Sequence, residues 1–125
     1  MTIFYADDDA EDCDLFTEAL QQIDADIKCI VAKDGREALA YLQHTRDLPD
    51  YIFLDINMPF IDGWMFLDDY EHIKSKLAKP ISIYMVSSSI DPRDMSRARN
   101  NGNVKDYVVK PVTREKFIEL LKHAA

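Results

Sequence analysis

The hydrophobic residues of this chain follow two alternating patterns. Short continuous apolar runs are typical of strands buried on both faces of a sheet, and stretches with an apolar residue every three or four positions are typical of helices. The apolar runs cover residues 2–6, 27–32, 51–55, 81–86 and 106–109. Five predicted strands thus alternate with five predicted helices, which favours a parallel sheet with helices on both faces and right-handed crossovers.

Residue types also set expectations for where helices begin and end. A second helix is predicted from an N-cap at Asp34 to about residue 43, and a third from Trp64 to about residue 77. Asn103, or Gly102 beside it, is expected to take the left-handed conformation that commonly stops a helix.

The fourth and fifth helices have clear capping signals. Asp91 can act as an N-cap with Pro92 in the first helical position, and Thr113 can cap the last helix. Only Met95 and Ala98 give the fourth helix an apolar side. We therefore expect it to be the least firmly anchored helix of the molecule.

The composition restricts the possible functions. With 125 residues, 47% of them hydrophobic, the chain suits one globular domain spanning residues 1–125. The formal net charge of −8 repels phosphate backbones, so direct nucleic-acid binding is not expected. The first residues lack the basic and long apolar segments of a signal peptide or a membrane span, so we expect a cytoplasmic protein without membrane attachment.

The cysteines and histidines do not suggest a zinc or redox site. Cys13 and Cys29 match no metal-binding spacing and, without an export signal, are interpreted as reduced packing residues. His44, His72 and His123 lie far apart on predicted helices. A cluster of histidine and cysteine ligands is therefore not expected.

Polar residues fall at the ends of four predicted strands. Asp7 and Asp8 follow the first strand, Asp55 ends the third, and Ser87 and Lys110 follow the fourth and the fifth. Parallel strands share one carboxyl edge, where open α/β sheets place their ligand crevice. We therefore expect these five side chains to lie together, although they are far apart in the sequence.

The residue types at this edge suggest transfer of a phosphoryl group onto a carboxylate. Carboxylates about 4 Å apart repel by roughly 4 kcal/mol per pair at an effective dielectric near 20, so they should hold a proton or a cation. Oxygen ligands favour Mg²⁺ over Zn²⁺, Lys110 can meet an anion beside the metal, and Ser87 can donate its hydroxyl. Each residue alone could be an ordinary capping, turn or surface residue; their coincidence at four strand ends favours a site.

These residues lie in segments that resemble the receiver domain of bacterial two-component response regulators, in particular stand-alone regulators of the chemotaxis type. The matching segments are Asp7-Asp8, Leu54-Asp55-Ile-Asn-Met-Pro59 with Asp62-Gly63, Val86-Ser87-Ser88 and Tyr107-Val-Val-Lys110-Pro111. The resemblance covers nearly the whole chain. It implies a flavodoxin-like fold, a doubly wound α/β architecture with a five-stranded parallel sheet in the order 2-1-3-4-5.

The resemblance also implies how a phosphoryl group and a metal would be held. Asp55 would accept the phosphoryl group from a histidine kinase or a phosphotransfer protein. Mg²⁺ would be bound by Asp8, Asp55 and the backbone carbonyl of Asn57, with Asp7 helping through a bound water. The chain would then be a phosphoacceptor switch that catalyses at most its own phosphotransfer and dephosphorylation.

Further residues would convert phosphorylation into a signal. Lys110 would pair with the phosphoryl group across a cis peptide to Pro111, Ser87 would hydrogen-bond it, and Tyr107 would rotate inward when Ser87 moves. The chain departs from the family pattern at Ser87, where Thr is commoner, and at Asn103-Val104, where Gly-Ala is usual. The serine keeps the hydroxyl but loses the methyl group that stiffens the rotamer.

The expected output is a surface that binds a downstream protein, because the chain ends about where the fifth helix ends. The family usually uses the fourth helix, fifth strand and fifth helix, where Arg93, Arg97 and Arg99 would form a basic patch unless they are simply solvated. Two other functions stay open. One is a phosphorylation-independent adaptor, and the other is a haloacid-dehalogenase-type phosphatase, which would need an acid at the position of Asn57.

Overall fold

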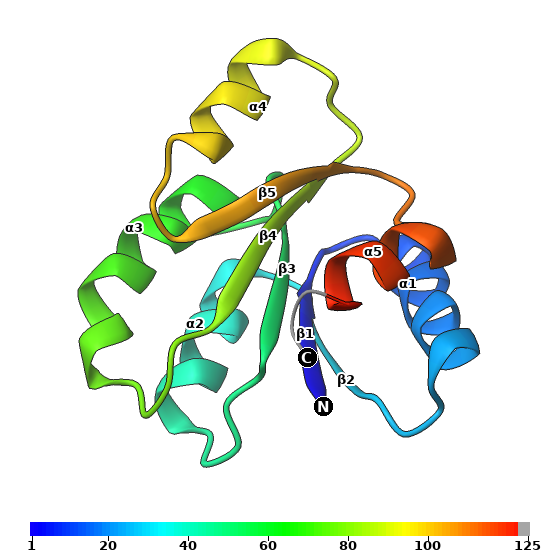
Figure 1. Cartoon of the computed structure of the whole chain (residues 1–125). Coiled ribbons are helices and arrows are strands. Elements are labelled where there is room, and N and C mark those ends of the chain that lie inside the picture. Colours follow the sequence, from blue (N-terminus) through cyan, green and yellow to red (C-terminus); the bar gives the residue numbers. More distant parts are fainter. Residues whose placement is uncertain (123–125) are drawn as a thin grey trace.

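The computed structural model describes residues 1–122 and consists of one sheet between two layers of helices (Figure 1). The strands are β1 (Thr2–Ala6), β2 (Lys28–Ala32), β3 (Tyr51–Asp55), β4 (Ser82–Ser87) and β5 (Val104–Val109). The helices are α1 (Ala10–Ile23), α2 (Gly35–His44), α3 (Gly63–Ile73), α4 (Pro92–Arg99) and α5 (Arg114–Lys122), with a 3-10 turn at Lys74–Lys76. His123 lies outside the described residues.

All the strand pairings are parallel, and the strand order is β2-β1-β3-β4-β5, so the predicted fold class and topology are confirmed. The register pairs Ala6 with Leu54, and Asp55 with Val86. Segments that follow β1, β3 and β4 therefore emerge side by side at the carboxyl edge of the sheet.

Helices cover both faces of the sheet, α2 and α3 on one face and α1 and α5 on the other (Figure 1). On the first face, Ile52 and Leu54 of β3 belong to the same buried cluster as Phe66 of α3. On the second face, the Phe53 ring lies 5.2 Å from the Phe16 ring of α1. Because β3 is buried on both sides, its sequence is a continuous apolar run rather than an alternating one.

The predicted starts of α2, α4 and α5 are confirmed, and α3 begins at Gly63, one residue before its predicted start. The side chains of Asp34, Asp91 and Thr113 each accept a backbone N–H from the following turn, at 2.8, 2.9 and 3.1 Å. Pro92 occupies the start of α4, where its missing N–H costs no hydrogen bond.

Two predicted boundaries are wrong. α3 ends at Ile73 instead of near residue 77, because the chain tightens there into the 3-10 turn. β5 begins at Val104, two residues before the predicted start. The two added residues are Val104, which is buried and pairs with Ile83 near the start of β4, and the exposed Lys105.

The prediction of a left-handed residue after α4 is also wrong. Neither Gly102 nor Asn103 has a positive φ, and within residues 1–122 the only residue that does is Phe60. Asn101 closes the turn after α4 instead. Its side-chain oxygen accepts the Asn103 N–H at 2.9 Å, and its carbonyl accepts the Val104 N–H at 3.0 Å.

α4 is held with little apolar burial, as predicted. Of its residues, all within the described part of the chain, Ala98 alone is buried, and Met95 is partly buried. The helix lies at one end of the molecule (Figure 1) and is fastened partly by surface contacts. The Arg97 guanidinium lies 4.2 Å from the centroid of the Trp64 ring, which stacks it on the first turn of α3.

Among the helices that the structure describes, none is both long and apolar enough to cross a membrane. Cys13 is buried and Cys29 partly buried, and both are free thiols, as predicted.

Candidate functional site

Carboxylates from β1 and β3 meet at the carboxyl edge of the sheet. Asp7, Asp8 and Asp55 place carboxylate oxygens within 4.8 Å of one another. Asp7 and Asp55 are buried, with exposures of 0% and 6%, whereas Asp8 is exposed. The register explains this crowding, because Ala6 of β1 pairs with Leu54 of β3 and Asp7 and Asp55 are the residues that follow them.

Lys110 brings a positive charge to these carboxylates from the end of β5. Its Nζ donates to Asp7 Oδ2 at 2.7 Å and to Asp12 Oδ2 at 2.8 Å, and it lies 3.4 Å from Asp55 Oδ1. Burial works against the ammonium charge, but the hydrogen bonds to Asp12 and Asp7 and the charge of Asp55 outweigh it and raise the pKa of Lys110. The peptide bond that follows Lys110 is cis, the geometry that the family resemblance implies.

Asp55 is unfavourable as an isolated anion. Burial of its carboxylate and repulsion from Asp7 raise the pKa of Asp55 to about 7, although Lys110 acts in the opposite direction. The protonated form of Asp55 is therefore favoured well above the pH at which an ordinary aspartate ionises. A divalent cation could replace that proton and relieve the excess negative charge.

Asp7 is fixed by its neighbours. The Tyr5 hydroxyl donates to Asp7 Oδ2, and the Asp9 N–H donates to Asp7 Oδ1 at 3.0 Å. Burial of the phenol and its hydrogen bond to Asp7 raise the pKa of Tyr5, so the hydroxyl keeps its proton. Asp7 thus has little freedom to change partners.

The loop after β3 is closed tightly against the site. The Gly63 N–H donates back to the start of the loop at 2.8 Å, and a Cβ on Gly63 would lie 2.6 Å from the Asp55 carbonyl oxygen. Phe60 turns the loop with a φ of 66°, and the Arg36 guanidinium lies 3.5 Å from the centroid of its exposed ring. Asn57 is exposed in this closed loop.

The donor set fits Mg²⁺. Three carboxylates converge on one point, and all are hard oxygen ligands. Asp8 is exposed, so the remaining coordination positions could be filled by water, which Mg²⁺ usually retains. Burial and, after it, repulsion from Asp7 raise the pKa of Asp55, so a cation bound here would favour the ionised carboxylate.

Ser87 is buried at the end of β4, where its Oγ accepts the Ser89 N–H at 3.1 Å. Ser89 makes further contacts, including one in which its Oγ accepts the Asp91 N–H at 3.2 Å. Its carbonyl accepts the Tyr107 hydroxyl at 2.8 Å, and its own hydroxyl donates to Asp94 of α4 at 2.9 Å. Ser89, which the sequence analysis did not single out, therefore connects Ser87 to Tyr107 and to α4.

The family resemblance implies that Tyr107 rotates inward when Ser87 moves, but in this structure the ring of Tyr107 is already inside. Its side chain is already buried, 4% exposed, in the cluster that contains Ala98. The inward position is satisfied because the Ser89 carbonyl accepts the phenol proton, so burial leaves no unpaired polar atom. A switch would therefore begin with the segment around Ser89 rather than with entry of the ring.

Asp12 is the site residue that the sequence analysis missed. It lies in the first turn of α1. It belongs to an acidic stretch of which the sequence analysis singled out only Asp7 and Asp8. Helical side chains lean toward the N-terminus of their helix, so an acid one turn into α1 can reach back to the sheet edge. This lean of helical side chains is the feature from which the sequence could have indicated Asp12 as a site residue.

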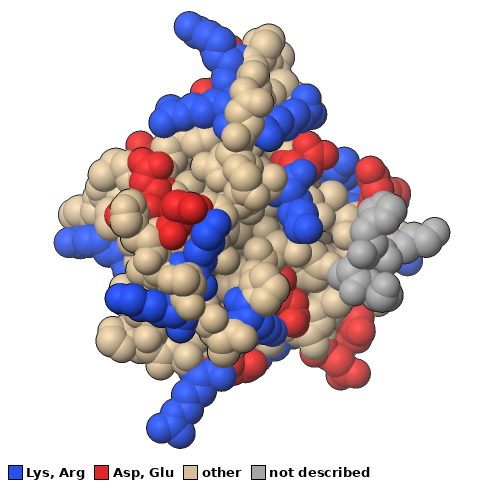
Figure 2. Space-filling view, turned by 60° about the vertical axis from the view of Figure 1, so that its left-hand side comes forward, with Lys and Arg blue, Asp and Glu red and all other residues tan. Residues whose placement is uncertain are grey.

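The three arginines of α4 do not form a free cationic patch. Arg93 and Arg99 are each paired with a carboxylate, at 2.8 and 3.3 Å, and Arg97 stacks on an indole ring. Figure 2 shows basic side chains spread around the projecting end of the molecule, with acidic side chains between them and the rest of the surface. The charge of the predicted patch is therefore partly neutralised within the molecule, and only its role in docking stays a prediction.

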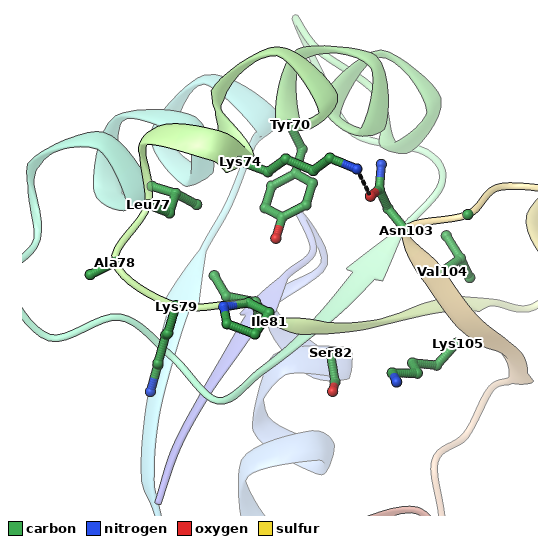
Figure 3. A pocket seen from close by; sticks show the side chains of 12 residues that line it. Tyr70, Lys74, Leu77, Ala78, Lys79, Ile81, Ser82, Asn103, Val104 and Lys105 are labelled. Carbon is green, nitrogen blue, oxygen red and sulfur yellow. Dashed lines mark hydrogen bonds between the residues drawn. The ribbon is translucent and has the colours of Figure 1, made fainter.

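A separate hollow of about 640 Å³ lies at the opposite, amino edge of β4 and β5 (Figure 3). The Tyr70 ring lies across its middle, and Lys74, Lys79 and Lys105 surround it. Two of these lysines are already paired with nearby carboxylates, each at 2.8 Å. The hollow therefore lacks the convergence of buried charge that distinguishes the carboxyl edge.

Known proteins resemble this chain along nearly its whole length. The family profile described as "response regulator receiver domain" matches residues 3–122. The sensor histidine kinase CheAY of Helicobacter pylori is 27% identical over 118 residues, which cover 94% of this chain and 14% of that protein. Across three curated relatives, the chain spans 7% to 54% of their length.

Solved structures agree with the sequence comparisons. The chemotaxis response regulator CheY4 of Vibrio cholerae superposes with a TM-score of 0.79 and 27% identity, covering 99% of this chain and 98% of that one. The phosphorylated cyanobacterial phytochrome response regulator RcpA also gives a TM-score of 0.79 and 27% identity, covering 98% of this chain and 89% of that one.

Proposed function

We infer that this chain, which belongs to the response regulator receiver family, takes a phosphoryl group onto Asp55 from a histidine kinase or a phosphotransfer protein. The observation that carries this inference is the convergence of Asp7, Asp8 and Asp55 within 4.8 Å, with Lys110 3.4 Å from Asp55. Receiver domains are phosphoacceptors with an acidic magnesium pocket and not conventional enzymes. The kinase and the downstream protein belong to the proposal.

Each site residue has a role in this transfer. A carboxylate oxygen of Asp55 would attack the phosphorus of a phosphohistidine, and the bond from phosphorus to the imidazole nitrogen would break with its electron pair leaving on the nitrogen. Asp8, Asp55 and the Asn57 carbonyl would hold Mg²⁺, which supplies positive charge next to the transferring group. Asp7 would act through a water, which its existing bonds to Tyr5 and Lys110 support.

A route from the phosphoryl group to the surface runs through Ser87. Donation of its hydroxyl to a phosphoryl oxygen would be a charge-assisted hydrogen bond worth roughly 1.5–3 kcal/mol, enough to bias two conformations. Movement of Ser87 would disturb the hydrogen bond that its Oγ now accepts from Ser89. Because Ser89 also binds Tyr107 and Asp94, the disturbance would reach β5 and α4 together.

The output surface is proposed to be α4, β5 and α5. Three exposed apolar residues support it: Ile90 before α4, Val109 on β5 and Ile118 on α5 are 75%, 38% and 44% exposed. Such residues suit a protein partner better than nucleic acid, which the net charge of −8 disfavours. The cytoplasmic location remains a prediction.

Acetyl phosphate with Mg²⁺ tests the phosphoacceptor role directly. Intact-mass spectrometry should find one added phosphoryl group on the wild type and on Asp69→Asn, which changes an exposed carboxylate of α3. Asp55→Asn should gain none, because an amide is not nucleophilic and also weakens the metal site. Undiminished labelling of Asp55→Asn would place the acceptor elsewhere.

The same reagents separate the two alternatives. A phosphorylation-independent adaptor would bind its partner yet take up neither a phosphoryl group nor beryllofluoride in the presence of Mg²⁺. A phosphatase of the haloacid dehalogenase type would turn over phosphate esters, but Asn57 stands where that class needs its general acid.

A further inference from the structure

The Lys110 ammonium donates hydrogen bonds to two carboxylates and forms an ion pair with a third. It carries three protons, and Asp7, Asp12 and Asp55 lie 2.7, 2.8 and 3.4 Å from its nitrogen. A phosphoryl group on Asp55 would present further oxygens to the same ammonium. Lys110 can donate more than one proton to these oxygens only if one of its two hydrogen-bonded partners gives way.

The three partners differ in how easily they can be displaced. Asp7 is completely buried and also held by Tyr5 and by a backbone N–H. Asp55 carries the phosphoryl group itself under the proposed function. The Asp12 side chain is 34% exposed and faces a hollow of about 340 Å³ that it lines together with Lys110. Asp12 is therefore the partner that can most easily leave Lys110, because its carboxylate can move into the hollow and be solvated there.

The helix cap explains why Asp12 is available to Lys110. An acid at the third position of a helix often turns back to the backbone N–H of the N-cap residue. In α1 that N–H belongs to Asp9 and is already bound by Asp7 at 3.0 Å. The Asp12 carboxylate does not accept this N–H and instead accepts a hydrogen bond from Lys110.

We infer that Asp12 is a positioning residue that holds Lys110 in the resting site and competes with the phosphoryl group for it. This inference rests on the proposed function. Asp12 would stabilise the unphosphorylated arrangement and weaken binding of a phosphoryl group, because it occupies one ammonium proton of Lys110.

Beryllofluoride titration at saturating Mg²⁺ tests the inference, with the fluorescence of Trp64, the single tryptophan, as the signal. Asp12→Asn keeps the shape of the side chain and should bind beryllofluoride about fivefold more tightly, the size expected for losing a partly exposed ion pair. Asp12→Glu should restore an affinity close to that of the wild type. Asp14→Asn removes an exposed charge from the same helix and should change little.

A second arm tests whether Asp12 acts through Lys110. In a Lys110→Met background, adding Asp12→Asn should no longer tighten beryllofluoride binding, because the two residues share one interaction. Mg²⁺ binding alone should not tighten in Asp12→Asn, since the substitution removes a negative charge near the metal.

The possible outcomes distinguish this inference from the proposed function. If the wild type does not bind beryllofluoride with Mg²⁺, the proposed function itself fails. If the wild type binds but Asp12→Asn is unchanged or weaker, or if Asp14→Asn tightens binding equally, Asp12 does not compete for Lys110 and only this inference is overturned. Tightening that persists in the Lys110→Met background overturns it as well.

Discussion

Lysine ammonium groups lie at nearly the same distance from carboxylates at the two edges of the sheet, but the strength of the electrostatic interaction differs. At the carboxyl edge, Lys110 lies 2.7 and 2.8 Å from two carboxylates, and its side chain is 16% exposed. At the amino edge, Lys74 and Lys79 each lie 2.8 Å from one carboxylate, with side chains that are 43% and 41% exposed. Water screens the second set far more strongly. Burial, rather than distance, separates a reactive cluster from ordinary surface pairs.

Stoichiometry separates the two edges further. Lys79 and Asp50 pair one to one, and the hydrogen bond from Lys79 holds the pKa of Asp50 below its usual range. Lys110 faces three carboxylates, and burial of Asp55 together with repulsion from Asp7 raises the pKa of Asp55 to about 7 in spite of the lysine. The carboxyl edge is thus left in need of a cation, whereas the amino edge is already satisfied. Buried carboxylates with strongly shifted pKa values are commonly found at functional sites.

Removing the lysine of the carboxyl edge should have the largest effect on stability. Lys110→Met keeps the length of the side chain but leaves Asp7 and Asp55 buried without a counter-charge. Loss of one partner of a buried ion pair costs about 3–5 kcal/mol of unfolding free energy. Urea denaturation in EDTA at neutral pH should show this loss, and Mg²⁺ should recover part of it.

Lys116→Met is the matched control, since Lys116 pairs at 3.5 Å with a side chain that is 63% exposed. If both substitutions cost the same, burial would not be what distinguishes the carboxyl edge.

Removing the charge of Asp55 should act in the opposite direction. Its pKa in the folded protein, about 7, lies above the ordinary value of 3.8, so folding favours the protonated form. This contribution to stability is fully present below about pH 4 and is lost as the pH rises to about 7. Without metal, Asp55→Asn should therefore be more stable than the wild type by roughly 2–4 kcal/mol above pH 7.

Unfolding curves in EDTA between pH 4 and pH 8 measure this difference. It should shrink toward zero at the acidic end, and Mg²⁺ should reduce it at pH 8 by stabilising the wild type. A constant difference across the pH range would mean that Asp55 is not the titrating group.

The sequence alone sufficed for the sheet and for most of the site. The continuous apolar run of β3 identifies a central strand, and the parallel rhythm then places Asp7, Asp55 and Lys110 at one edge whatever the loops do. These features depend on periodicity, which is local. The capping residues could be predicted for the same reason.

The remaining features depend on contacts between side chains that are distant in sequence. The partnership of Asp12 with Lys110 spans 98 positions, and several neighbouring acids looked equally able to make it. The inward position of Tyr107 depends on an acceptor at Ser89 that only the folded loop supplies. The turn after α4 uses Asn101 side-chain chemistry in place of a left-handed residue, and either solution fits the local sequence.

The smallest effect is expected at the amino edge. Lys79→Met removes the ammonium that lies 2.8 Å from Asp50 but leaves the N–H of Thr2, which donates to the same carboxylate at 2.9 Å. Asp50 stays solvated and hydrogen-bonded, so the variant should lose less than about 1 kcal/mol of unfolding free energy. In 1 M NaCl the Debye length falls to about 3 Å, and the difference from the wild type should nearly vanish.

Urea denaturation at low and high salt measures both values, with Lys105→Met, at an exposed lysine beside the same hollow, as the control. A loss as large as that of Lys110→Met, or one that high salt leaves unchanged, would show that the amino edge also stores buried charge, and the contrast between the two edges would fail.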